Sequence, residues 1–79
     1  MQIVEVEWED SCAEMGWHTP RDIKGYDVSH CRSVGYLLGK DRKKVVILQS
    51  ASDSPSFCEA LTIPRGNVKK ITYLKGEET

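Results

Sequence analysis

A period of two in the first ten residues constrains the fold of this 79-residue chain more than any other feature. In MQIVEVEWED, Val4, Val6 and Trp8 fall on one side of an extended backbone and three glutamates fall on the other. Side chains of a β-strand alternate between its two faces, and β-branched and aromatic residues favour strands. The sequence therefore predicts a half-buried strand at the N-terminus.

Further segments of strand type follow in the second part of the chain: Ser33–Leu38, Lys44–Ser50, Phe57–Ile63 and Val68–Leu74. The first two are joined by a hairpin over residues 39–43. Val45–Leu48 is apolar at every position, which predicts a strand covered on both faces. Because so short a chain buries only a modest core, we expect one covering layer to come from a second subunit.

Residues 11–31 have no regular period and form a long loop, a feature that is often functional in a small domain. The stretch TPRDIKG inside it has the parts of one helical turn. Thr19 is a suitable cap and Pro20 suits the first helical position. Asp22 favours the first turn, and Gly25 ends it.

The order of strands and connections matches a small barrel of the SH3-like kind. Pro64 ends a strand because it lacks a backbone donor, and Gly66 or Asn67 suits the positive φ of a sharp corner. The expected fold is all-β: a five-stranded SH3-like or Sm-like barrel with one helical turn in its long first loop. Residues 1–75 are expected to form a single domain and residues 76–79 a frayed polar tail.

The stretch LTIPRGNVKKITYL resembles the second sequence signature of Sm and Sm-like RNA-binding proteins over Ile63–Val68. In that family an apolar strand runs into Arg-Gly, often followed by Asn, and these residues help to form a base pocket inside a ring of subunits. The resemblance implies that Arg65, Gly66 and Asn67 contact RNA. The leading helix and the first signature of the family are missing here.

A second resemblance covers nearly the whole chain. VEVEWEDS, GW, SVGYLLGKD, VVILQS and IPRGNVKKI together resemble a group of small, mostly uncharacterised bacteriophage proteins. The resemblance implies a phage or prophage origin and a small barrel. Small phage proteins often bind host factors or sequester host immune signals.

Composition is that of a folded protein, with 39% hydrophobic and 29% charged residues. No apolar run approaches the roughly 20 residues that span a bilayer, and no basic-then-apolar leader opens the chain. We therefore expect no membrane partner and a place in the host bacterial cytosol.

Charge is unevenly distributed: seven acidic and two basic residues up to Cys31, then nine basic and five acidic ones. The basic residues gather on the hairpin and around the last corner: Lys40, Arg42, Lys43, Lys44, Arg65, Lys69 and Lys70. Arginine forks and backbone donors at a glycine corner suit phosphate oxygens, and a ring of subunits can bring the two regions together. A pI near 6.1 disfavours general nucleic-acid binding. The alternative is a solvated edge that discourages strand pairing.

Aromatic residues divide into two groups. Trp8 is expected in the core. Trp17 and Tyr26 lie in the long loop, where they either line a binding surface or complete the core over the barrel mouth.

The potential metal ligands and nucleophiles are Cys12, His18, His30, Cys31 and Cys58. The close ligand pairs of a zinc site are absent, so thiols and no metal are expected. No P-loop, GxSxG, HExxH or paired-carboxylate motif is present. The sequence predicts a protein that is not an enzyme and needs no cofactor.

The combined hypothesis is a non-catalytic phage-type binding protein that forms a homo-oligomer and binds a nucleotide-like anion or RNA. The expected ligand-binding residues are Arg65, Gly66, Asn67, Lys43, Lys44, Trp17 and Tyr26. The alternative is an interaction module that docks on a host or virion protein through its long loop.

Overall fold

The computed structural model describes residues 1–13, 15–52 and 57–74, so the expected frayed tail lies outside the described residues. The chain is all-β apart from two short 3₁₀ helices. The elements are β1 (Ile3–Asp10), η1 (Pro20–Gly25), β2 (Ser29–Lys40), β3 (Lys44–Ala51), β4 (Phe57–Pro64), η2 (Arg65–Asn67) and β5 (Val68–Leu74). No helix among the described residues is long and apolar enough to cross a membrane.

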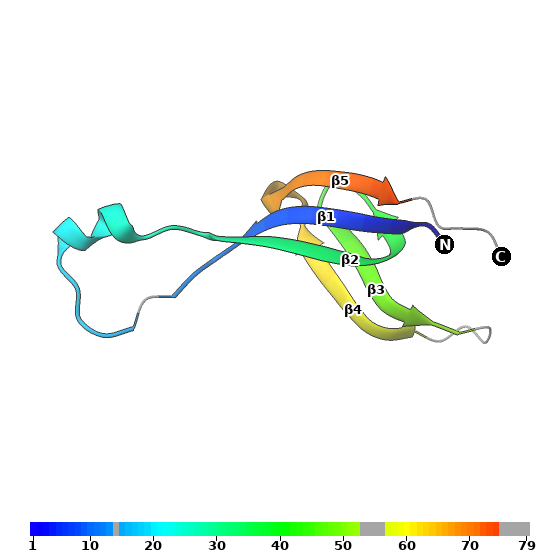
Figure 1. Ribbon diagram of the computed structural model, residues 1–79, viewed down its shortest axis with the longest axis horizontal. Helices are drawn as coiled ribbons and strands as arrows, with labels where there is room; N and C mark the ends of the chain where they lie inside the picture. The colour runs from blue at the N-terminus through cyan, green and yellow to red at the C-terminus, as the bar shows by residue number, and fades with distance from the viewer. Residues whose placement is uncertain (14, 53–56, 75–79) are drawn as a thin grey trace.

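The five strands form one antiparallel sheet in the order β4-β3-β2-β1-β5 (Figure 1). β4 and β5 are its two edges. The sheet of the described strands is therefore open, and the closed barrel expected from the sequence is not formed by these pairings.

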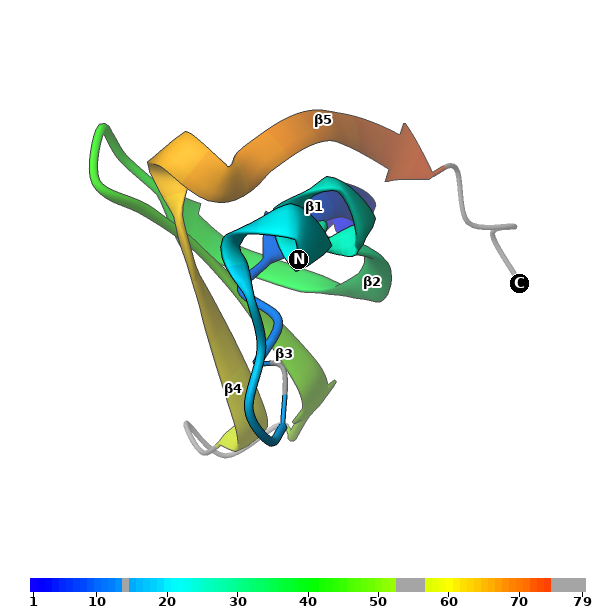
Figure 2. The same cartoon turned by 90° about the vertical axis from the view of Figure 1, so that its left-hand side faces the viewer.

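The sheet is strongly curved because β2 bends along its length (Figure 2). Residues 29–36 pair with β1, whereas residues 36–40 pair with β3. The register slips between Leu37 and Gly39, and an extra residue of this kind bends a strand. The bend carries the end of β2 toward β5, where the Lys40 ammonium donates to the Tyr73 hydroxyl at 2.7 Å.

A small hydrophobic core fills the concave side of the sheet. Its buried members are Val4, Val6, Val45, Ile47 and Ile63, with Trp8, Leu37, Val68 and Ile71 packed against them. Trp8 therefore belongs to the core, as expected from the alternation.

β3 does not need a second subunit to cover it. Val45, Ile47 and Leu48 are buried within one chain, and Val46 is half-buried. The burial of this strand therefore does not require the layer that was expected from a second subunit. Val45 and Ile47 pack in the core on one face, and Leu48, which is 1% exposed, lies on the other.

The corner before β5 is the 3₁₀ turn expected from the sequence, but its backbone differs from the expected one. Neither Gly66 nor Asn67 has a positive φ. A 3₁₀ turn keeps φ negative at every residue, so this corner needs no left-handed residue. The turn is closed by the Val68 N–H, which donates to the Arg65 carbonyl.

Candidate functional site

The long connection between β1 and β2 projects from the sheet as an arm, which we define as residues 11–28 (Figure 1). Every described side chain in the arm is exposed. Trp17 is fully exposed, and Met15 and Ile23 keep 87% and 68% of their surface in solvent. The interpretation in which Trp17 folds back to complete the core does not fit this geometry.

The arm tip is held by contacts within itself. The Asp22 carboxylate accepts from the Thr19 N–H at 2.8 Å, and the Asp22 N–H donates to the Thr19 carbonyl at 2.9 Å. A ring nitrogen of His18 lies 2.7 Å from the Met15 carbonyl oxygen. The His18 ring also meets Tyr26 edge-on, with 5.4 Å between ring centroids. Tyr26 therefore supports the tip, whereas Trp17 faces solvent.

The β2–β3 turn and η2 form a second feature, the basic corner, which consists of Lys40, Arg42, Lys43, Lys44 and Arg65. The Arg65 N–H donates to the Lys43 carbonyl at 2.8 Å, and Lys44 pairs with Pro64 across β3 and β4. These contacts bring Arg65 to the basic β2–β3 turn within one chain, without a ring of subunits, whereas Lys69 of the second basic region lies 3.6 Å from Glu9. Lys40, Arg42 and Arg65 line an open hollow of about 320 Å³ there, together with Asp41.

Asp41 is the acidic member of the turn, and its carboxylate is turned toward the backbone. It accepts from the Lys43 N–H at 2.7 Å and from the Lys44 N–H at 2.9 Å. These bonds favour the ionised carboxylate and hold the pKa of Asp41 below its usual value. The carboxylate thus organises the turn while the cationic side chains around it stay exposed.

The expected PRGN site is divided between two sides of the corner. The Arg65 N–H is used by Lys43 and is not available to a ligand. Gly66 and Asn67 line a different hollow of about 220 Å³ at the base of the arm, beside Glu9 and Asp10. The structure therefore groups Arg65 with Lys43 and Lys44, and separates these three from Gly66 and Asn67.

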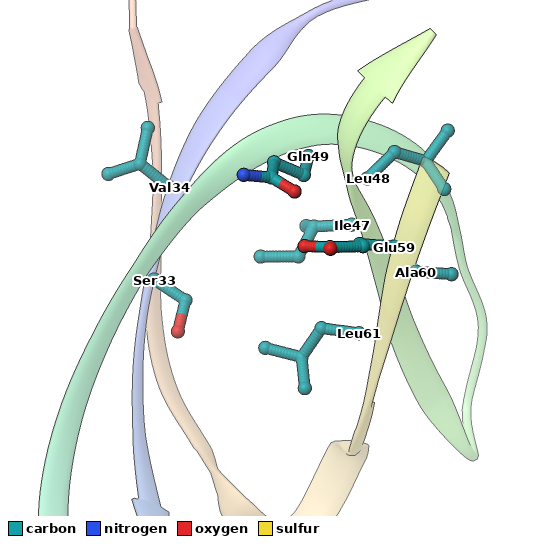
Figure 3. Close-up of a pocket in the computed structure, with 8 residues that line it drawn as sticks. All are labelled: Ser33, Val34, Ile47, Leu48, Gln49, Glu59, Ala60 and Leu61. Atoms are coloured by element: carbon teal, nitrogen blue, oxygen red, sulfur yellow. The ribbon is translucent and has the colours of Figure 1, made fainter. Parts of the chain in front are cut away.

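A third feature, the concave hollow, was not anticipated from the sequence. It has a volume of about 280 Å³ and lies over β3, between β2 and β4. Side chains of Ser33, Ile47, Gln49, Glu59 and Leu61 point into this space (Figure 3). The alternation of 47 with 49 and of 59 with 61 along neighbouring strands is the signal that places them on one face.

The cysteines and histidines are dispersed. Cys12 and Cys31 are free thiols, and the side chain of Cys58 lies outside the described part of the chain. His30 lies 3.8 Å from both Glu9 and Asp27, whereas His18 belongs to the arm tip. Within residues 1–13, 15–52 and 57–74, no group of three His, Cys, Asp or Glu residues is arranged to hold a metal.

Comparison of the chain with protein-family models, with curated proteins and with solved structures gave no match.

Proposed function

We propose that this protein is a non-catalytic binding protein that engages a partner protein through its arm. The observation that carries the proposal is the fully exposed Trp17 on an arm that projects from the sheet. Large aromatic side chains contribute most to binding when a partner buries them, and tryptophan is enriched among the residues that dominate interfaces. The contacts of Asp22 and His18 hold the tip in shape before binding, which lowers the entropy lost on association.

Anion binding at the basic corner is a second candidate function. The bond between the Arg65 N–H and the Lys43 carbonyl supports it, because it places Arg65 at the β2–β3 turn, where Lys40, Arg42 and Arg65 line one hollow. The ligand chemistry is a phosphate group, carried by a nucleotide-like molecule or by RNA. The corner is open and offers side chains rather than a backbone cradle, so we place this candidate second.

We further propose that the curved, open sheet is a variant of the SH3-like or Sm-like barrel fold and that the protein is of phage origin. The strand order and the 3₁₀ corner before β5 support the first part. The second part, and with it a role in the host bacterial cytosol against host immune signals, is supported by the sequence resemblance alone.

Site-specific photo-crosslinking tests the arm. A photoreactive residue in place of Met15 is expected to give an adduct of one discrete mass in the producing cells. Trp17→Ala should remove that adduct. The matched control places the same group at Leu74, which is exposed at the end of β5 and lies outside both the arm and the hollows described above. Absence of any adduct from position 15, or equal labelling from positions 15 and 74, would refute the proposed function.

A further inference from the structure

We infer that the partner of the arm is a second copy of this chain, whose concave hollow receives the arm tip. The inference rests on the proposed function, because it names the partner of the same arm. The hollow and the tip each expose apolar side chains beside charged ones, with Glu59 at the hollow and Arg21 and Lys24 at the tip.

The hollow has the size and lining of a site for one large side chain. Its volume of about 280 Å³ lies just below the range for small-molecule sites, about 300–1,000 Å³. Ile47 and Leu61 supply an apolar floor and wall, and Leu61 keeps 37% of its surface in solvent. Gln49 and Glu59 supply acceptors that suit an indole N–H (Figure 3). The phosphate of a nucleotide would be repelled by the Glu59 carboxylate here, whereas the indole of a tryptophan could bury its ring in the hollow and donate its N–H to an acceptor.

Glu59 is held in an unusual backbone conformation. Its φ of 54° lies in the left-handed region, which residues other than glycine seldom occupy. Gln49 and Glu59 are not part of the regular pairing, although Leu48 pairs with Ala60 and Ser50 with Cys58 on either side. The carboxylate is displayed over the hollow instead of lying along the strand (Figure 3).

The arm tip carries the complementary chemistry. Met15, Trp17 and Ile23 are its exposed apolar side chains. Arg21 and Lys24 are exposed on η1, and Asp22 between them has a half-exposed carboxylate that accepts from the Thr19 N–H. The tip therefore presents apolar side chains next to two cations and one carboxylate bound to its own backbone, and the hollow presents an apolar floor next to one carboxylate.

The elongated shape of the chain places the arm tip far from the sheet, where it can contact another molecule. The chain measures 55 × 25 × 23 Å, and the long axis is that of the arm (Figure 1). The arm leads away from the sheet and so carries its tip away from the hollow of its own chain. Reciprocal insertion gives a closed dimer, and one-way insertion gives a ring or an open chain.

Complementation between two damaged copies tests the inference. Trp17→Ala removes the indole of the tip and leaves the hollow intact. Glu59→Lys reverses the charge at the hollow and leaves the tip intact. Wild-type protein at tens of micromolar is expected to have at least twice the chain mass by light scattering in the presence of reductant. Each variant alone should be a monomer with an unchanged circular dichroism spectrum. An equimolar mixture should form a complex, because one intact tip then meets one intact hollow.

Charge reversal supplies a second test that does not depend on tryptophan. Lys24→Glu should weaken self-association at least tenfold, and combining it with Glu59→Lys in one chain should restore most of the affinity. The matched control is Arg65→Ala, which lies in the basic corner and should leave the mass unchanged.

The outcomes separate this inference from the proposed function. A position-15 adduct of twice the chain mass, with complementation, supports both. An adduct with a different protein, while the wild type stays monomeric, overturns the second-copy inference and leaves the arm as the binding element. A monomer with no adduct overturns both, and so does an adduct within one chain, because the tip then contacts its own chain instead of a partner.

Discussion

At the residue scale, Gly35 on β2 and Gly66 in η2 differ in how much space surrounds them. Gly35 lies on β2 against β3, where an added Cβ would stand 2.7 Å from the Leu48 carbonyl oxygen and 3.3 Å from the Ile47 Cβ. Gly66 lies in η2, where an added Cβ would meet nothing within 4 Å. The close approach of β2 to β3 thus requires a glycine, and the corner does not.

This contrast predicts the outcome of two alanine substitutions. Gly35→Ala should lower the free energy of unfolding by about 1–3 kcal/mol, because backbone atoms must move to admit the methyl group. Gly66→Ala, the matched control, should stay within about 0.5 kcal/mol of wild type. Urea denaturation measures both. Equal losses for the two variants would mean that the strand spacing or the corner geometry described here is wrong.

Arg65 gives a residue-scale test of the basic corner. Its side chain is exposed, so Arg65→Ala should change the free energy of unfolding by no more than about 0.5 kcal/mol. If the corner binds phosphate, the same change should weaken binding of a labelled single-stranded RNA or nucleotide about tenfold or more, since a charge-assisted contact contributes about 1.5–3 kcal/mol. Lys43→Ala should cost less and its effect should fade with salt. Fluorescence anisotropy that is unchanged by Arg65→Ala would remove this candidate function.

At the element scale, the local sequence pattern predicted the bounds of several elements, but it did not predict which elements contact one another. The bounds of β5 and the helical turn at Pro20–Gly25 follow from alternation and from capping residues, and both are confirmed. β2 begins four residues earlier than expected, because polar residues such as Ser29 and His30 pair with β1 although they lack strand character. The grouping of Arg65 with Lys43 depends on the pairing of β3 with β4, and a sequence without a known register does not show it.

The β2–β3 turn should respond to pH through Asp41. Its folded-state pKa lies below the ordinary value near 3.9, so the carboxylate stabilises the turn above about pH 4 and loses this effect as the pH falls through the lowered folded-state pKa. The amide signals of Lys43 and Lys44 in NMR spectra should shift in that acidic window and stay constant above it. In Asp41→Asn, which cannot ionise, the acidic shift should vanish. A midpoint above pH 4 would contradict the contacts described for this carboxylate.

The arm should be separable from the sheet. No described residue of the arm is buried, and Asp10 pairs directly with Ser29 at its base. Replacing residues 11–28 by Asn-Gly, which suits a two-residue hairpin turn, should therefore keep the melting temperature within a few degrees of wild type. The same replacement should abolish the crosslink and the self-association. Unfolding of the shortened chain would show that the arm supports the sheet.

At the scale of the whole molecule, one small core carries the fold. Five buried hydrophobic side chains on the described strands form its centre, and Cys12 and Cys31 are free thiols. The all-β class and the five strands could be predicted from the spacing of strands and turns, whereas the expected closed barrel is an open curved sheet in the described strands. The concave hollow could not be predicted. It depends on how β4 lies relative to β2 across β3 and on the backbone conformation of Glu59, and local propensity specifies neither.

The last prediction concerns the source of stability. Domains of this size often depend on a disulfide or a structural metal, and metal binding then contributes directly to the free energy of folding. If the core of Val4, Val6, Val45, Ile47 and Ile63 is sufficient, neither EDTA nor dithiothreitol should move the melting temperature by more than about 2 °C. Ile47→Ala, by contrast, should cost about 2–5 kcal/mol, a large part of the stability of a small domain. Calorimetry with and without each reagent makes the comparison. A fall of many degrees with EDTA would point to a metal held by side chains such as His30 and Glu9, and a fall with dithiothreitol would point to a disulfide in the working protein.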